Sequence, residues 1–86
     1  MPLGKDPLTD YAVERVAGRL MLARERAGLT RERLAQKIGI SYSSVANFEA
    51  GRQDMPLSRI LAYLRATGAD PAWVFKPADS PDDLPG

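Results

Sequence analysis

Apolar residues recur at helical spacing along most of the chain. Within residues 13–27, and again within 57–64, they lie three and four positions apart, which places them on one face of an α-helix. No stretch alternates apolar and polar residues with the period of two that a half-buried strand requires. The pattern therefore predicts an all-α protein. The residues on the two faces are Val13, Val16, Ala17, Leu20, Ala23 and Ala27, and then Leu57, Ile60, Leu61 and Leu64.

Start and stop signals divide the chain into five helices. Three starts share one arrangement, in which an apolar residue precedes a hydroxyl residue and a second apolar residue follows four positions later. The hydroxyl can accept from first-turn amides, while the apolar pair fixes the incoming chain. Glycine follows each of these helices and suits the left-handed ending. The sets are Leu8, Thr9 and Val13; Leu29, Thr30 and Leu34; and Ile40, Ser41 and Val45; the glycines are Gly28, Gly39 and Gly51.

Two further helices follow. Pro56 suits a first turn, where a missing amide hydrogen costs nothing, and Asp70 before Pro71 is typical of a cap. The expected helices cover about residues 10–27, 31–38, 42–50, 56–67 and 71–75. We therefore expect one domain over residues 10–76, with a flexible arm over 1–9 and an acidic, proline-rich tail over 77–86.

Composition narrows the function classes. The 86 residues include no cysteine and no histidine, so disulfides, thiolate or imidazole metal ligands and the commonest catalytic bases are missing. The acidic residues are scattered rather than paired. We expect no enzyme activity, no cofactor and no metal site. Without an apolar run of membrane length or a signal-peptide layout, the chain is expected to be cytoplasmic.

Charge is unevenly distributed. The formal net charge is +1, yet residues 11–69 hold ten Lys or Arg against five acids, while the flanks are net acidic. A basic central region suits a nucleic-acid partner, but a solvated helical surface would give the same count.

Residues 30–51 combine two short helices with a tight connection. The segment reads TRERLAQKIGISYSSVANFEAG, and the small Ala35 would let the two helices cross closely. It resembles the helix-turn-helix of the phage Cro and C1 repressor type, also called xenobiotic-response-element-like, over about residues 14–75. The resemblance implies a five-helix, lambda-repressor-like DNA-binding domain with the helix-turn-helix at helices 2 and 3. The matching residues are Leu29, Thr30, Leu34, Ala35, Gly39, Ser41, Val45, Glu49, Gly51 and Pro56.

The resemblance also implies how DNA would be bound. The third helix would lie in the major groove, with Tyr42, Ser43, Ser44 and Asn47 at base edges. Tyr42 departs from the amide or small polar residue common in the family, so a thymine methyl and a phosphate are both open as its contact. The alternative is that the two serines only cap the helix and that Asn47 is only solvated.

Phosphate contacts are expected at both ends of this unit. Helix amino termini and arginine side chains favour anions, so the resemblance assigns Thr30, Arg31, Arg52 and Gln53 to the DNA backbone. Arg24 and Glu49 stand where the family often has an ion pair that links the first and third helices, and we expect a structural pair there rather than a DNA contact.

The implied function is that of a sequence-specific transcriptional repressor that binds a palindromic operator as a homodimer. The expected dimer surface comprises Leu57, Tyr63, Trp73, Val74 and Phe75, with Trp73 or Val74 turned inward. In the alternative, Trp73 packs back on Leu61 and Leu64 and completes the monomer core. A second class also stays open, an antitoxin or interaction regulator that binds a protein partner through the tail and DNA only secondarily. The tail also leaves open whether the chain is part of a longer repressor.

Overall fold

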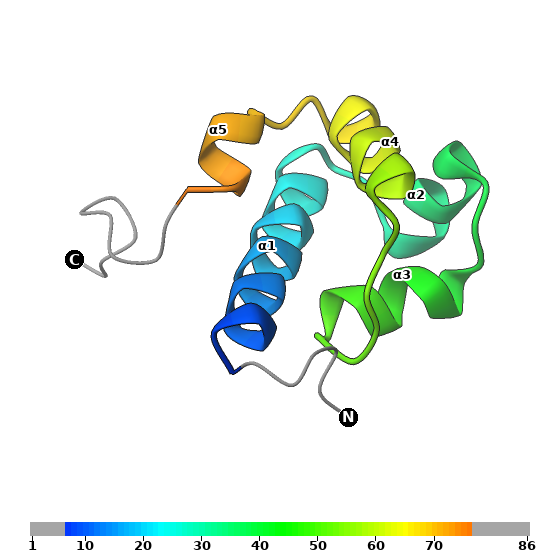
Figure 1. The fold of residues 1–86 in the computed structure, drawn as a ribbon. Helices are drawn as coiled ribbons and strands as arrows, with labels where there is room; N and C mark the ends of the chain where they lie inside the picture. The colour runs from blue at the N-terminus through cyan, green and yellow to red at the C-terminus, as the bar shows by residue number, and fades with distance from the viewer. Residues whose placement is uncertain (1–6, 77–86) are drawn as a thin grey trace.

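A computed structural model describes residues 7–76 of the chain. Within that range the protein is built from helices alone (Figure 1). The five-helix, all-α prediction is therefore confirmed, and the bounds of α2 agree with it residue for residue. The expected arm and tail fall largely outside the described residues. The helices are α1 (Pro7–Arg26), α2 (Arg31–Ile38), α3 (Tyr42–Glu49), α4 (Leu57–Thr67) and α5 (Pro71–Val74).

Two helix starts differ from the prediction. Helix α1 begins at Pro7, so Thr9 lies inside the helix and is not its cap. Proline at a first helical position sacrifices no hydrogen bond, which makes this earlier start possible. Pro56 is the N-cap residue of α4 rather than its first helical residue, and its side chain makes no capping bond.

The caps of the two central helices follow the sequence. Thr30 Oγ1 accepts from the Arg33 amide at 3.1 Å, and Ser41 Oγ accepts from the Ser44 amide at 3.1 Å. Gly39 ends α2 with φ 73°, a left-handed conformation that a side chain would oppose. Its amide donates to the Ala35 carbonyl at 2.8 Å. These local bonds set the short turn between α2 and α3.

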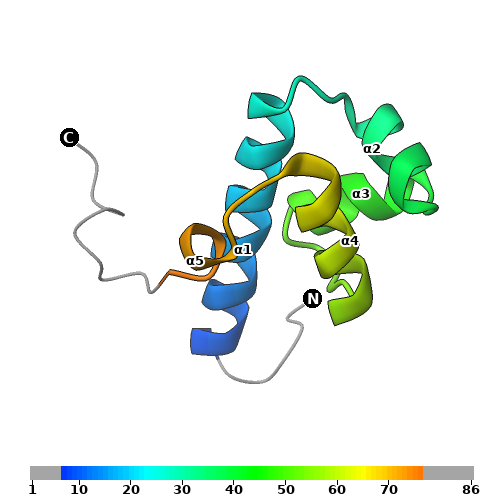
Figure 2. The same cartoon turned by 90° about the horizontal axis from the view of Figure 1, so that it is seen from above.

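One core joins all five helices. Helix α1 packs on α3 and α4, and α2 packs on the same two helices (Figure 2). None of the helices in residues 7–76 is long and apolar enough to cross a lipid bilayer. The buried cluster consists of Ala17, Leu20, Leu34, Ala35, Val45, Phe48, Met55, Tyr63, Leu64 and Val74.

Helix α5 is held on the other side of α1 from α2 and α3 (Figures 1 and 2). Arg19 donates from Nη1 to the carbonyls of Trp73 and Lys76, and Arg15 donates to the Lys76 carbonyl at 2.9 Å. Cations are favourable at the carboxyl end of a helix, where carbonyls lack partners. Burial, and secondarily the charge of Arg15, lowers the pKa of Arg19. The short helix is thus fixed by α1 side chains and by the burial of Val74.

Candidate nucleic-acid interface

Helices α2 and α3 form a compact pair with a three-residue connection. The Ile40 amide donates to the Ala35 carbonyl at 3.1 Å, so the chain turns directly after α2. Ala35 is buried, as are Leu34 and Val45, whereas the first two residues of α3 are exposed. The pair therefore turns its apolar side to the core and leaves the amino-terminal turn of α3 accessible.

The four side chains assigned to base edges differ in exposure and in the hydrogen bonds that they already make. Tyr42 is 48% exposed and Ser43 is exposed, while Ser44 and Asn47 are half-buried. Ser41 Oγ donates to Ser44 Oγ at 2.9 Å and accepts from the Ser44 amide. Ser44 thus takes part in the helix cap, as the alternative interpretation held, and its hydroxyl is less free than that of Ser43.

The expected phosphate contacts lie at the two ends of the same unit. Thr30 caps α2, so its hydroxyl oxygen is already used by the Arg33 amide. Arg52 and Gln53 are both exposed directly after α3, and the Arg52 amide closes the end of that helix on the Asn47 carbonyl at 2.9 Å. Arg31 differs from these residues because its side chain turns partly inward.

A buried carboxylate links four helices. Glu49, whose side chain is 1% exposed, receives two hydrogen bonds from Arg24: Nε to Oε2 at 2.8 Å and Nη2 to Oε1 at 3.1 Å. The expected ion pair between α1 and α3 is therefore present. It is bidentate, the geometry in which a guanidinium binds a carboxylate most strongly. Arg24 also donates to the Leu29 carbonyl at 2.8 Å, which ties the start of the α1–α2 connection to the same group.

Two further donors to Glu49 were missed in the sequence. Arg31 Nε lies 2.9 Å from Oε1, and the Tyr63 hydroxyl donates to Oε2. The phosphate assignment of Arg31 had overlooked this contact. A tyrosine on the apolar face of α4 was a usable signal, because a buried phenol needs a hydrogen-bond partner. Its partner could not be named, since the two residues belong to different helices.

The electrostatics of this cluster follow from burial and hydrogen bonding. Burial pushes the pKa of Glu49 upward, but hydrogen bonds from Arg24, Tyr63 and Arg31 outweigh it and hold the pKa below the ordinary value. Burial, together with the bond to Glu49, raises the pKa of Tyr63. The bond to Glu49 also raises the pKa of Arg24. The carboxylate is therefore charged and the phenol neutral in the folded protein near neutral pH.

Two residues of the expected dimer surface, Tyr63 and Val74, are buried in the monomer. Tyr63 is fully buried among the helices of its own chain, because its hydroxyl is bonded to Glu49, so it is not available to a partner subunit. Val74 is also fully buried and is the inward residue. Leu57 and Phe75 are 66% and 48% exposed. The indole of Trp73 is approached by the guanidinium groups of Arg19 and Arg26, at 5.7 and 5.0 Å from the ring centroid.

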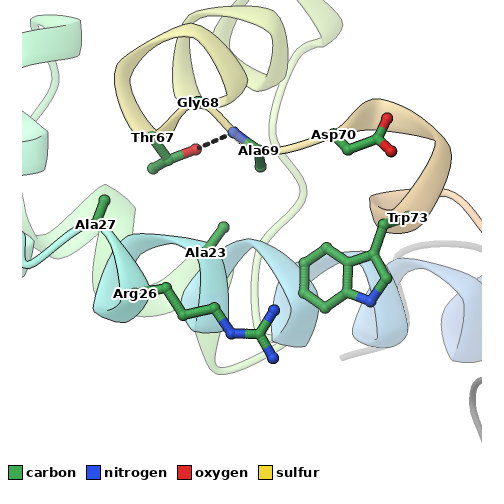
Figure 3. Close-up of a pocket in the computed structure, with 8 residues that line it drawn as sticks. All are labelled: Ala23, Arg26, Ala27, Thr67, Gly68, Ala69, Asp70 and Trp73. Atoms are coloured by element: carbon green, nitrogen blue, oxygen red, sulfur yellow. Dashed lines mark hydrogen bonds between the residues drawn. The ribbon is translucent and has the colours of Figure 1, made fainter.

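Two hollows lie away from the amino terminus of α3. A pocket of about 300 Å³ is formed by α1, the end of α4 and α5, and there the Arg26 side chain extends toward Trp73 (Figure 3). An apolar groove of about 180 Å³ is lined mainly by Ala12, Val13, Val16, Phe48, Ile60 and Phe75. Residues 7–76 contain no cluster of acidic side chains that could hold a metal ion.

Comparison with known proteins agrees with this geometry. No curated protein matches the chain. Among solved structures, it is similar to the hypothetical transcription factor NHTF from Neisseria, with a TM-score of 0.66 and 24% sequence identity. The likeness covers 90% of this chain and 88% of the Neisseria chain, and it shows a shared fold.

The family comparison is the more decisive one. A family model described as a helix-turn-helix domain matches residues 15–74, which is well over half of the chain. That range runs from the middle of α1 to the last residue of α5, so it takes in the Glu49 cluster as well as the α2–α3 unit. The chain belongs to the helix-turn-helix domain family.

Proposed function

We propose that the protein is a sequence-specific DNA-binding transcriptional repressor of the Cro and C1 type. The observation that carries this proposal is the α2–α3 unit. Its second helix exposes the first two residues of its amino-terminal turn, and its last residue, Glu49, is anchored in the core by Arg24. A helix held in this way can enter the major groove without losing its position. The description of the Neisseria protein as a hypothetical transcription factor is in keeping with it.

The side chains divide into two groups by the chemistry that each can offer. Hydroxyl and amide groups on α3 can exchange hydrogen bonds with base edges, whereas the α2 amino terminus and the segment after α3 face the DNA backbone. The base-reading group comprises Tyr42, Ser43, Ser44 and Asn47, with Ser44 the most restricted. The phosphate group comprises Thr30, Arg31, Arg52 and Gln53.

The active form in this proposal is a homodimer. One short recognition helix reads only a few base pairs, and two copies related by a two-fold axis read a palindrome with half-sites about 34–36 Å apart. Leu57 and Phe75 provide exposed apolar surface, and Phe75 also borders the apolar groove. Leu57 is the first residue of α4 and Phe75 directly follows α5. A partner bound there leaves the base-reading turn of α3 free.

Selection of bound duplexes from a random DNA pool, followed by gel-shift titration, tests the proposal. The expected result is a palindromic consensus and an affinity that falls steeply as salt rises, because phosphate contacts release counterions. A chain that enriches no sequence and forms no salt-sensitive complex is not a DNA-binding regulator. That result would favour a protein-interaction role.

A further inference from the structure

The pocket between α1, the end of α4 and α5 owes its space to small residues. We call it the Trp73 pocket, after the aromatic residue in its lining. Its volume of about 300 Å³ lies at the lower end of the range for small-molecule sites. Larger side chains at the end of α1 or in the α4–α5 connection would fill it. The small residues that line it are Ala23, Ala27, Gly68 and Ala69.

Hydrogen bonds fix the walls of the Trp73 pocket on both sides. Thr67 Oγ1 donates to the Tyr63 carbonyl at 2.9 Å and accepts from the Ala69 amide at 3.4 Å (Figure 3). On the other side, Arg19 donates to the Trp73 carbonyl, and its guanidinium lies 5.7 Å from the centroid of the indole ring. The walls are therefore in place before a ligand arrives, and a preformed site spends less of its binding free energy on ordering.

Arg26 gives the Trp73 pocket a positive charge that its neighbours do not neutralise. Its guanidinium lies 5.0 Å from the centroid of the Trp73 ring, and within residues 7–76 it makes no hydrogen bond and no ion pair. Asp70 also lines the pocket, but its carboxylate accepts from the Ala72 amide at 3.0 Å and points away from Arg26 (Figure 3). The N–H groups of Arg26 thus remain available to an acceptor from outside, and a carboxylate fits a guanidinium best.

The lining therefore sets two separate requirements for a ligand. A planar ring can lie on the alanine floor beside the indole, because aromatic pairs attract one another beyond the area that they bury. A carboxylate on that ring can bind Arg26. We propose that the Trp73 pocket binds a small aromatic carboxylate, with its ring against Trp73 and its carboxylate on the guanidinium of Arg26. No residue of α2 or α3 lines this pocket, so the proposal does not depend on the proposed function.

Benzoate is the probe for this site, and it is titrated into the ¹⁵N-labelled full chain at constant ionic strength. The amide signals of Ala27, Gly68 and Ala69 should shift along one saturating curve, with a dissociation constant on the order of 1 mM for so small a ligand. Signals from α3 should not move. Benzamide lacks the charge and acetate lacks the ring, so each should bind at least about tenfold more weakly.

Three variants test which groups make the site. Arg26→Gln should weaken benzoate binding at least about tenfold but leave benzamide binding unchanged, because it removes only the charge. Arg33→Gln, which removes an exposed arginine from α2, is the matched control and should bind benzoate as the wild type does. Ala27→Phe should abolish binding by filling the floor while Arg26 stays. Arg26 and Ala27 are both exposed, so thermal melts of all three variants should match that of the wild type.

Several results would contradict the proposal. It is wrong if benzoate shifts none of the pocket signals even at about 20 mM, well above the expected dissociation constant. It is also wrong if Arg26→Gln binds benzoate as tightly as the wild type does. Acetate that binds as well as benzoate would indicate a site for any small anion, and benzamide that binds as well would indicate an apolar site without a role for Arg26. Failure to select a DNA sequence would overturn the proposed function and leave this site untouched.

Discussion

At the residue scale, Glu49 decides how the helices are fixed to one another. A carboxylate taken out of water is costly unless several donors surround it. Here donors from α1, α2 and α4 converge on a side chain of α3. The same group therefore stabilises the fold and sets the position of the candidate recognition helix. Its removal should lower the free energy of unfolding more than it changes the contacts with bases.

Glu49→Ala should lower the free energy of unfolding by about 3–5 kcal/mol, because it leaves the guanidinium of Arg24 buried without its partner. Urea denaturation followed by circular dichroism measures this. Glu32→Ala, an exposed acid on α2, is the matched control and should change stability by less than about 0.5 kcal/mol. Additive losses in Arg24→Ala, Glu49→Ala and the double variant would show that the two residues do not interact.

The lowered pKa of Glu49 also predicts a pH dependence. A carboxyl that is more acidic in the folded state contributes stability that is present above its unfolded pKa of about 4.5 and is lost as the pH falls through the folded value. Urea midpoints should therefore drop below about pH 4.5 more steeply for the wild type than for Glu49→Gln, which has no such group. Parallel curves for the two proteins would contradict this prediction.

At the scale of the elements, α3 is expected to contact base edges, and the segments on either side of it are expected to contact phosphates. Asn47→Ala should relax base preference at one operator position by about 1–3 kcal/mol. Arg52→Ala should instead weaken binding to all sequences and flatten the salt dependence. Selection with each variant, followed by titration at several salt concentrations, separates the two. Arg65→Ala, an exposed arginine on α4, is the control, and an unchanged consensus in Asn47→Ala would refute the base-reading role.

Helix α5 has only four residues and cannot be stable by itself. Its carbonyls are bound by Arg19, so Arg19→Ala should loosen it from α1. Trp73 is the only tryptophan of the chain and reports directly on this contact. Acrylamide should quench its fluorescence more strongly in the variant than in the wild type or in Arg33→Ala. Equal quenching would mean that Val74 and the apolar contacts hold the helix alone.

At the scale of the whole molecule, dimerisation is expected on the surface that carries Leu57 and Phe75. Sedimentation at micromolar concentration should show a dimer for the wild type and a monomer for Phe75→Asp. Leu22→Asp also introduces a charge at an exposed apolar residue, but on α1, and should stay dimeric. Tyr63→Phe should also stay dimeric, because that side chain is buried. A monomeric wild type, or a dimeric Phe75→Asp, would exclude this interface.

The helix bounds were largely predictable because their causes are local. The caps at Thr30 and Ser41 and the left-handed glycine at residue 39 act within a few positions, so the pattern alone placed α2 and α3. The basic central region and the missing cysteine and histidine also come from the sequence. The start of α1 was predicted wrongly, at Thr9, because Thr9 and Pro7 both suit a helix amino terminus and only the structure shows that the helix begins at Pro7.

The contacts between helices needed the tertiary structure. The pair of Arg24 and Glu49 was expected from resemblance, but nothing near Arg31 in the sequence shows that its side chain turns toward Glu49 rather than only toward solvent. Tyr63 was likewise assigned to the surface, because spacing alone cannot tell an apolar face that covers the core from one that faces a partner. The burial of a side chain depends on which helices pack against its own helix. That packing is set by many residues together, so no single position in the sequence reveals it. The sequence by itself therefore determined the helices and the chemistry they carry, and the tertiary structure decided which side chains bind the buried carboxylate and which stay exposed.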